Sequence, residues 1–127
     1  MSISKEIRTQ LIQLARRSQT RFARFTRQRP THWNPGSVRN PKGISDSTFN
    51  NITAWELIVE QLEAGCEVNV VKLKVPAGKT GYVMEIDLGE GEQQLYVKLE
   101  LGSGKIYGRS FHYSRFTRAK RRDNEIE

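Results

Sequence analysis

Apolar residues near the start of the chain recur every three to four positions, which is the spacing of one face of a helix. The pattern predicts an amphipathic helix from about Ser4 to Gln28, with Ser2 or Ser4 as its N-cap. Pro30 would end this helix, because the residue before a proline is disfavoured in helical geometry. The apolar face of the predicted helix consists of Ile3, Ile7, Leu11, Leu14, Ala15, Phe22 and Phe25.

The periodicity then stops, and residues 30–52 are rich in Pro, Asn and Gly, which predicts a long loop. A loop of this length is either a mobile linker or a binding loop. Within it, Trp33 is expected to pack against the domain, and stacking on a nucleic-acid base is the alternative. The neighbouring His32 is by itself a weak catalytic candidate.

Helical and then strand periodicity follow in the remainder of the chain. Thr53 and Glu56 have the spacing of a capping box and predict a short helix over residues 54–64. After Glu67 the period changes to two, and turn residues divide the segment into strands expected at 68–75, 81–88, 95–101 and 105–113. The predicted fold is α+β, a four-stranded antiparallel meander with a covering helix, preceded by the long basic N-terminal helix.

Four segments result from this pattern. They are a basic amphipathic helix (1–29), a loop (30–52), an α+β catalytic or binding domain (53–114), and a charged tail (115–127) expected to fray or to form a short helix.

The distribution of charge along the chain indicates which class of partner the protein binds. The 127-residue chain has a net charge of +7, and residues 1–43 hold ten Lys or Arg with Glu6 as their one acid. Residues 44–106, in contrast, hold twice as many acids as lysines. A basic end of this kind points to a polyanionic partner, most simply nucleic acid. Four arginines lie opposite the apolar face of the predicted helix, either as phosphate contacts or as a solvated surface: Arg16, Arg17, Arg24 and Arg27.

Several classes of protein are not expected. No apolar run approaches the roughly 18 residues of a membrane helix, and Arg16 and Arg17 interrupt any secretory signal, so a cytoplasmic protein without membrane association is expected. Cys66 is the single cysteine and is expected to be a small buried filler, which leaves no internal disulfide or Cys-based zinc site. Neither a metal nor another cofactor is expected, because the two histidines, His32 and His112, are far apart in sequence.

Strand alternation decides which polar groups can meet. In the third predicted strand, Leu95 and every second residue after it face the core, which leaves Tyr96, Lys98 and Glu100 on the other face. The fourth strand is ambiguous. We favour Tyr107 and Phe111 packing inward, which sets Ser110 and His112 beside Tyr96 and Lys98. A bulge near Gly108 would reverse this arrangement.

The resulting group of side chains matches the needs of RNA cleavage. His112 can transfer a proton near neutral pH, Lys98 or Arg109 can stabilise charge on a phosphate, and Tyr96 can donate a hydrogen bond or stack on a base. A metal-independent ribonuclease uses such groups to direct the 2′-OH of RNA at the adjacent phosphate. The alternative is an ordinary mixed polar surface. Further RNA contacts are expected from Lys79, Tyr82, Ser110 and Tyr113.

Lys79 lies in the segment Gly78-Lys-Thr80, which is weakly similar to the end of a phosphate-binding loop motif. The upstream glycine of that motif is absent and a strand follows instead of a helix, so nucleotide hydrolysis is excluded. Lys79 is then either a simple hairpin-turn lysine or a contact to RNA.

The segment QLYVKLEL, followed about eight residues later by SFHYS, resembles the C-terminal strands of RelE-like messenger-RNA interferase toxins. Among these it is most similar to the motility quorum-sensing regulator (MqsR) toxins. The resemblance covers residues 67–114 and implies an RNA-cleaving toxin that needs no metal and is neutralised by a bound antitoxin. It implies that Tyr96 corresponds to the functional tyrosine of the family and that His112 replaces its lysine.

The sequence therefore predicts an endoribonuclease toxin with RNA and an antitoxin protein as partners. The alternative is a non-catalytic nucleic-acid-binding module that uses the basic N-terminal helix and the C-terminal tail. A third reading is a small regulatory protein that binds an acidic protein partner.

Overall fold

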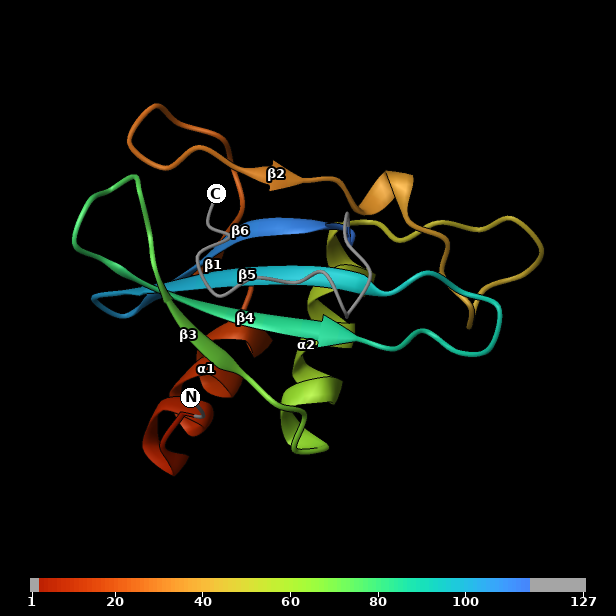
Figure 1. Cartoon of the computed structure of the whole chain (residues 1–127), viewed down its shortest axis with the longest axis horizontal. Helices are drawn as coiled ribbons and strands as arrows, with labels where there is room; N and C mark the ends of the chain where they lie inside the picture. Colours follow the sequence, from red (N-terminus) through yellow and green to blue (C-terminus); the bar gives the residue numbers. More distant parts are fainter. Residues whose placement is uncertain (1–2, 115–127) are drawn as a thin grey trace.

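The computed structural model describes residues 3–114, and the predicted charged tail, residues 115–127, lies outside the described residues. Two α-helices and six strands form one mixed α+β unit (Figure 1). In chain order, the elements are α1 (Lys5–Arg16), β1 (Arg21–Phe22), β2 (His32–Trp33), a 3-10 turn η1 (Pro35–Ser37), α2 (Asn51–Glu63), β3 (Asn69–Lys72), β4 (Thr80–Ile86), β5 (Leu95–Gly102) and β6 (Lys105–Tyr113).

The sheet is larger than predicted. Its order is β1-β6-β5-β4-β3, and β2 also pairs with β6. The last four strands pair antiparallel with their neighbours in chain order, whereas β1 and β2 pair parallel with β6. The prediction of four strands is therefore wrong. Two-residue strands within an Arg-rich segment and a Pro-rich loop leave no alternating pattern from which they can be recognised.

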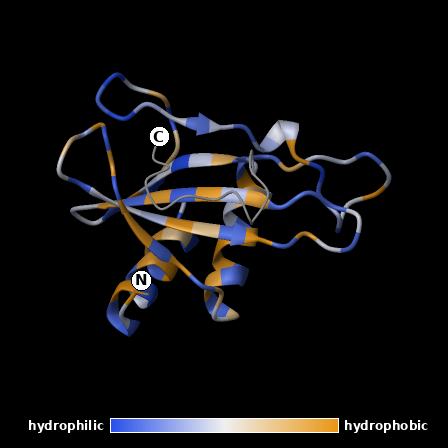
Figure 2. Cartoon of the chain, viewed as in Figure 1, coloured by the Kyte–Doolittle hydropathy of each residue, from blue (hydrophilic) through white to orange (hydrophobic). Residues whose placement is uncertain are grey.

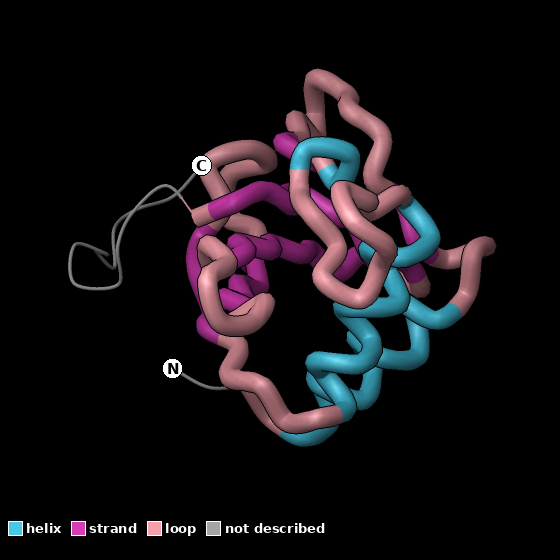
Figure 3. The backbone as a smooth tube through the Cα atoms, turned by 90° about the vertical axis from the view of Figure 1, so that its right-hand side faces the viewer, coloured by secondary structure: helices cyan, strands magenta, loops and turns pink. Residues whose placement is uncertain are grey.

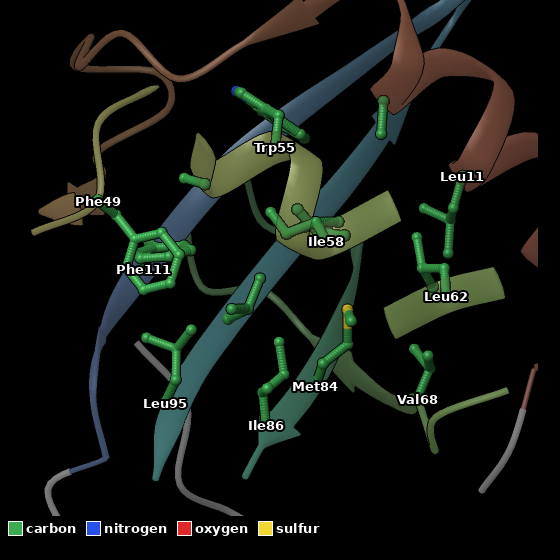
Figure 4. Close-up of a cluster of buried hydrophobic side chains, with 14 of the residues drawn as sticks. Leu11, Phe49, Trp55, Ile58, Leu62, Val68, Met84, Ile86, Leu95 and Phe111 are labelled. Atoms are coloured by element: carbon green, nitrogen blue, oxygen red, sulfur yellow. The ribbon is translucent and has the colours of Figure 1, made fainter. Parts of the chain in front are cut away.

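Both helices cover the same face of the sheet, as the edge view shows (Figure 3). The core lies between the helices and the sheet (Figure 4). The sheet contributes apolar side chains that strand alternation directs to the helix-covered face, and the helices contribute the apolar side chains that pack against them. Hydrophobic and hydrophilic residues accordingly alternate along these strands (Figure 2). The residues of this core include Leu11, Trp55, Ile58, Leu62, Met84, Ile86, Leu95 and Phe111.

Helix α1 is much shorter than predicted and ends at Arg16. Its last carbonyl groups accept hydrogen bonds from side chains that follow the helix: Thr20 Oγ1 donates to Leu14 O over 2.7 Å and Arg21 Nη1 donates to Ala15 O over 2.9 Å. These bonds satisfy carbonyls that have no partner within the helix. Phe22 and Phe25 therefore do not belong to its apolar face, because Phe22 lies in β1, which pairs with β6, and Phe25 lies in the loop that follows.

Helix α2 begins earlier than predicted. Asn50 is its N-cap, and Asn50 and Thr53 form a reciprocal capping box with two hydrogen bonds of 2.9 Å. Thr53 is thus the third helical residue and not the cap. At the other end, Arg8 of α1 donates hydrogen bonds to Leu62 O and Cys66 O, which ties the two helices together.

Trp33 packs against the domain, as predicted. Its ring centroid lies 5.0 Å from that of Trp55 and 5.4 Å from that of Phe111, and its Nε1 donates to Asn51 Oδ1 over 3.0 Å. The ring also covers Gly108 of β6, where an added Cβ would lie 2.4 Å from Trp33 Cζ3. Only glycine fits under this ring, so Gly108 allows β2 to lie against β6.

Replacing Gly108 with alanine is therefore expected to destabilise the fold by about 1–3 kcal/mol, because the indole is held on three sides and must shift. The measurement is the free energy of unfolding in urea. Gly36→Ala is the matched control, since no atom lies within 4 Å of a Cβ added there. Equal stability of the two variants would contradict this account of β2 packing.

Within residues 3–114, no helix has the length and apolar character needed to cross a membrane.

Candidate active site

The face of β5 and β6 opposite the helices holds the residues predicted from the sequence as catalytic candidates. In the β5–β6 register, Tyr96 lies opposite His112 and Lys98 lies opposite Ser110. The prediction that these four side chains share one face is therefore confirmed, and so is the inward packing of Phe111, which is fully buried.

The prediction for Tyr107 is wrong. The register of β6 shifts between Lys98 and Leu99, so that Arg109 is an extra residue in the ladder. Beyond this bulge the alternation reverses, and Tyr107 lies opposite Glu100 on the polar face, not in the core. A single inserted residue thus allows Phe111 to be buried while Arg109 and Tyr107 both contribute to the polar face.

Tyr96 and His112 form the centre of the site. Their rings stack with centroids 5.3 Å apart and an angle of 24° between the planes. The Nδ1 atom of His112 lies 2.8 Å from the carbonyl oxygen of Tyr113. Because a carbonyl oxygen can only accept, Nδ1 carries the proton, and the lone pair of the neutral ring is on Nε2. Nε2 is thus the atom of His112 that can take up a proton.

Lys98 and Ser110 extend the site along the two strands. Tyr96 and Lys98, expected to face solvent, are instead buried, with 5% and 1% of their surface exposed. Burial strengthens the field of an ammonium group, because the surroundings screen it less than water does. The hydroxyl of Ser110 is also buried and has no hydrogen-bond partner among the described residues. An unsatisfied buried hydroxyl costs on the order of 1–3 kcal/mol, which an incoming acceptor would offset.

The structure adds His32, which the sequence analysis left as a weak candidate. Parallel pairing of β2 with β6 places His32 opposite Ser110. Its ring meets that of His112 edge-on, with centroids 6.3 Å apart. The two histidines of the chain are 80 positions apart, and no local pattern relates them. The signal that could have suggested this contact is the Trp at position 33, whose burial fixes the neighbouring His on the opposite face.

Arg109 does not join this group. It donates from Nη1 to Glu100 Oε1 over 2.9 Å, and from Nε and Nη2 to the carbonyl oxygens of Pro30 and Val75. Arg29 also binds the Glu100 carboxylate, over 3.2 Å, and its guanidinium lies 4.0 Å from the centre of the Tyr107 ring. The Arg29–Glu100–Arg109 cluster, in which Glu100 and Arg109 are buried and Arg29 is partly exposed, fixes the loops that contain Pro30 and Val75 onto the polar face. The geometry gives Arg109 a positioning role.

Three further candidates for RNA binding lie away from the catalytic group. Tyr82 pairs with Leu99 and Tyr113 with Leu95, so both lie on the helix-covered face. The hydroxyl of Tyr113 accepts a hydrogen bond from Arg39 N over 2.9 Å, which is a structural contact. Lys79 is exposed in the β3–β4 turn.

The four arginines expected to form a stripe along one helix are separated. Arg16 ends α1 and pairs with Glu63 of α2, and Arg17 is the C-cap residue. Arg24 and Arg27 are exposed in the loop between β1 and β2. The helix therefore carries no continuous phosphate-binding stripe of these residues.

Cys66 is half-buried where α2 leads into β3. Burial raises the pKa of its thiol, and the guanidinium of Arg8 lowers it in part. A thiol with a raised pKa is a poor nucleophile near neutral pH. Within the described part of the chain, no three His, Cys, Asp or Glu side chains gather in a group that could hold a metal ion.

Comparison of the chain with known proteins adds no relative: no family model matches it, and no curated protein or solved structure is significantly similar to it.

Proposed function

We propose that the protein is an endoribonuclease that cleaves RNA by attack of a 2′-OH on the adjacent phosphate. The observation that carries this proposal is the convergence of two imidazoles, a phenol and an ammonium group on one face of the sheet. Together they offer the acid, the base and the charge stabilisation that transesterification of RNA requires.

His112 is the general base in this proposal. Its Nε2 takes the proton of the 2′-OH, and the 2′-oxygen then bonds to phosphorus. The bond between phosphorus and the 5′-oxygen breaks, and the departing oxygen receives a proton from protonated His32 on the other side of the phosphate. The products are a 2′,3′-cyclic phosphate and a free 5′-OH. The separation of 6.3 Å between the ring centroids supports this division, since one phosphate can lie within reach of both rings.

Lys98, Ser110 and Tyr96 bind the phosphate in this scheme. The ammonium group of Lys98 stabilises the negative charge that develops on the non-bridging oxygens. The Ser110 hydroxyl donates to one of these oxygens, and the Tyr96 hydroxyl donates to another or orients the ribose. Because Tyr96 and Lys98 are buried, binding of a substrate must expose them. Substrate binding is therefore coupled to a local opening of this face.

The biological role that fits this activity is that of a toxin in a toxin–antitoxin pair. The resemblance of residues 67–114 to RelE-like interferases supports this role. So does a mostly antiparallel sheet with helices on one face and the proposed catalytic groups on the other. In this role, a cognate antitoxin protein binds the enzyme and prevents growth inhibition.

The test uses two RNA oligonucleotides that are identical except at the scissile position, where one has a 2′-deoxyribose. The full-length protein is expected to cleave the all-ribose strand to a 2′,3′-cyclic phosphate in the presence of EDTA and to leave the modified strand intact. Mass spectrometry of the products distinguishes the ends. Cleavage of both strands, or products with a 3′-OH, would contradict the proposed chemistry. Binding without any cleavage would favour the non-catalytic nucleic-acid-binding module instead.

A further inference from the structure

The segment from the end of β1 into the loop before β2, together with the first residue of β6, carries exposed aromatic and basic side chains that the proposed catalytic site does not use. We name the aromatic–basic strip for its five members, which are Phe22, Arg24, Phe25, Arg27 and Lys105. Phe22 is 40% exposed and Phe25 is 62% exposed, which is unusual for side chains of this size. We propose that this strip binds single-stranded RNA, with a base stacked on Phe25 and phosphates held by the arginines.

The loop that presents Phe25 is fixed at both ends. At one end, Arg21 and Phe22 pair with Ile106 and Tyr107 of β6. At the other end, a turn closes on itself, with Thr26 N donating to Arg29 O over 3.2 Å and Arg29 N donating to Thr26 Oγ1 over 2.9 Å. Arg29 in turn binds the buried Glu100. Phe25 is therefore held outward by anchored backbone, which lowers the entropic cost of binding a base on it.

The charges around the two phenyl rings indicate which class of partner fits. Lys105 Nζ lies 5.6 Å from the centre of the Phe22 ring, and Arg24 and Arg27 flank Phe25 in the sequence. No carboxylate within residues 3–114 pairs with Arg24 or Arg27. Aromatic rings interleaved with unneutralised cations are typical of surfaces that bind single strands, because a base in a duplex has no free face to stack.

The position of the strip relates it to the catalytic group. The Phe22 ring lies 6.1 Å from that of Tyr107, on the same face of the sheet as His112. Tyr107 and His112 are five positions apart along β6, which corresponds to roughly 15 Å. In Figure 1 the loop that holds Phe25 projects from the end of the sheet where β5 turns into β6. A strand of a few nucleotides can therefore reach from the strip to the proposed cleavage site.

This inference rests on the proposed function for its choice of RNA, and the experiment separates the two. Fluorescence anisotropy measures the Kd of a labelled single-stranded RNA whose 2′-OH groups are all methylated, so that cleavage cannot occur. Phe25→Ala is expected to weaken binding about tenfold or more, and Phe25→Trp to retain it. The matched control is Ile44→Ala, which removes another apolar side chain that is 86% exposed on a loop. It is expected to leave Kd unchanged.

The contribution of Arg24 and Arg27 to RNA binding is measured from the salt dependence of the affinity. Replacing Arg24 and Arg27 with glutamine is expected to reduce the slope of log K against log salt by about one unit or slightly more. Unchanged affinity of Phe25→Ala, or an equal loss of affinity in Ile44→Ala, would overturn the inference that the strip binds RNA. The proposal of ribonuclease activity would not be affected. The strip would then be expected to bind a protein partner. If Phe25→Ala lost binding but the wild-type protein cleaved no RNA, the proposed ribonuclease activity would be contradicted and RNA binding by the aromatic–basic strip would be supported.

Discussion

Replacing His112 with alanine is expected to lower the rate of RNA cleavage by about a hundredfold to ten-thousandfold, which is the usual contribution of a positioned general base. The reason lies in the geometry of the ring, since its Nδ1 atom is engaged by the carbonyl of Tyr113 and its Nε2 atom is the one that can accept the 2′-OH proton. The measurement is the single-turnover cleavage rate of an RNA oligonucleotide at saturating enzyme, so that changes in binding do not contribute.

Two further variants decide whether the loss is chemical. His112→Asn keeps an N–H group able to donate to the Tyr113 carbonyl but offers no base, and it is expected to be as inactive as the alanine variant. Lys72→Ala removes an exposed cation from β3 and is expected to cleave at the wild-type rate. Substantial activity in His112→Asn would show that the imidazole only positions the strand end, and His112 could then not be the base.

Replacing Arg109 with alanine is expected to lower the free energy of unfolding by about 3–5 kcal/mol, because it breaks a buried ion pair and leaves polar groups without donors. Glu100 is 1% exposed and, among residues 3–114, would keep only Arg29 as an ion-pair partner. The carbonyl oxygens of Pro30 and Val75 would lose the guanidinium that now binds them. Chemical denaturation followed by circular dichroism measures the loss.

Arg39→Ala is the matched control for this experiment. Arg39 also pairs with a carboxylate, that of Glu92, but the side chains of the two are 41% and 20% exposed. Pairs of this kind contribute about 0–1 kcal/mol. Arg109→Lys tests the geometry as well, since lysine keeps the charge but cannot reach three partners with a planar fork. If Arg109→Ala were no less stable than Arg39→Ala, the cluster would not hold the two loops, and Arg109 would again be a candidate for the catalytic role first expected of it.

The C-terminal half of the fold could be predicted from the sequence because its determinants are local. Alternation along residues 95–101 assigns Tyr96 and Lys98 to one face of the strand, and this assignment does not depend on how the rest of the chain packs. The Gly-rich turn at 102–104 then joins two adjacent strands, and antiparallel pairing across a two-residue turn fixes their register. These two facts do not by themselves place Ser110 and His112 beside Lys98 and Tyr96. The register set at the turn would put Arg109 opposite Lys98, and only the bulge at Arg109 brings Ser110 into that position.

The N-terminal half could not be predicted in the same way. Residues 21–28 have helical periodicity, yet they form a short strand and a loop, because Arg21 and Phe22 pair with β6 and the chain then turns away from the sheet. The bulge at Arg109 is likewise invisible in the strand pattern. It reverses Tyr107 because Glu100 and two loop carbonyls are available to bind the guanidinium.

The sequence alone determined that Tyr96 and Lys98 share one face of their strand and that Ser110 and His112 share one face of theirs, because the direction of side chains in a strand is a local property. The bulge at Arg109 then decided that the two pairs lie on the same face of the sheet. Only the tertiary structure decided that His32 joins them, that Arg109 holds the loops, and that Phe25 points outward. Each of these depends on parallel strand pairing or on hydrogen bonds between segments tens of residues apart. Such contacts depend on how the whole chain packs and leave no periodic signal in the sequence.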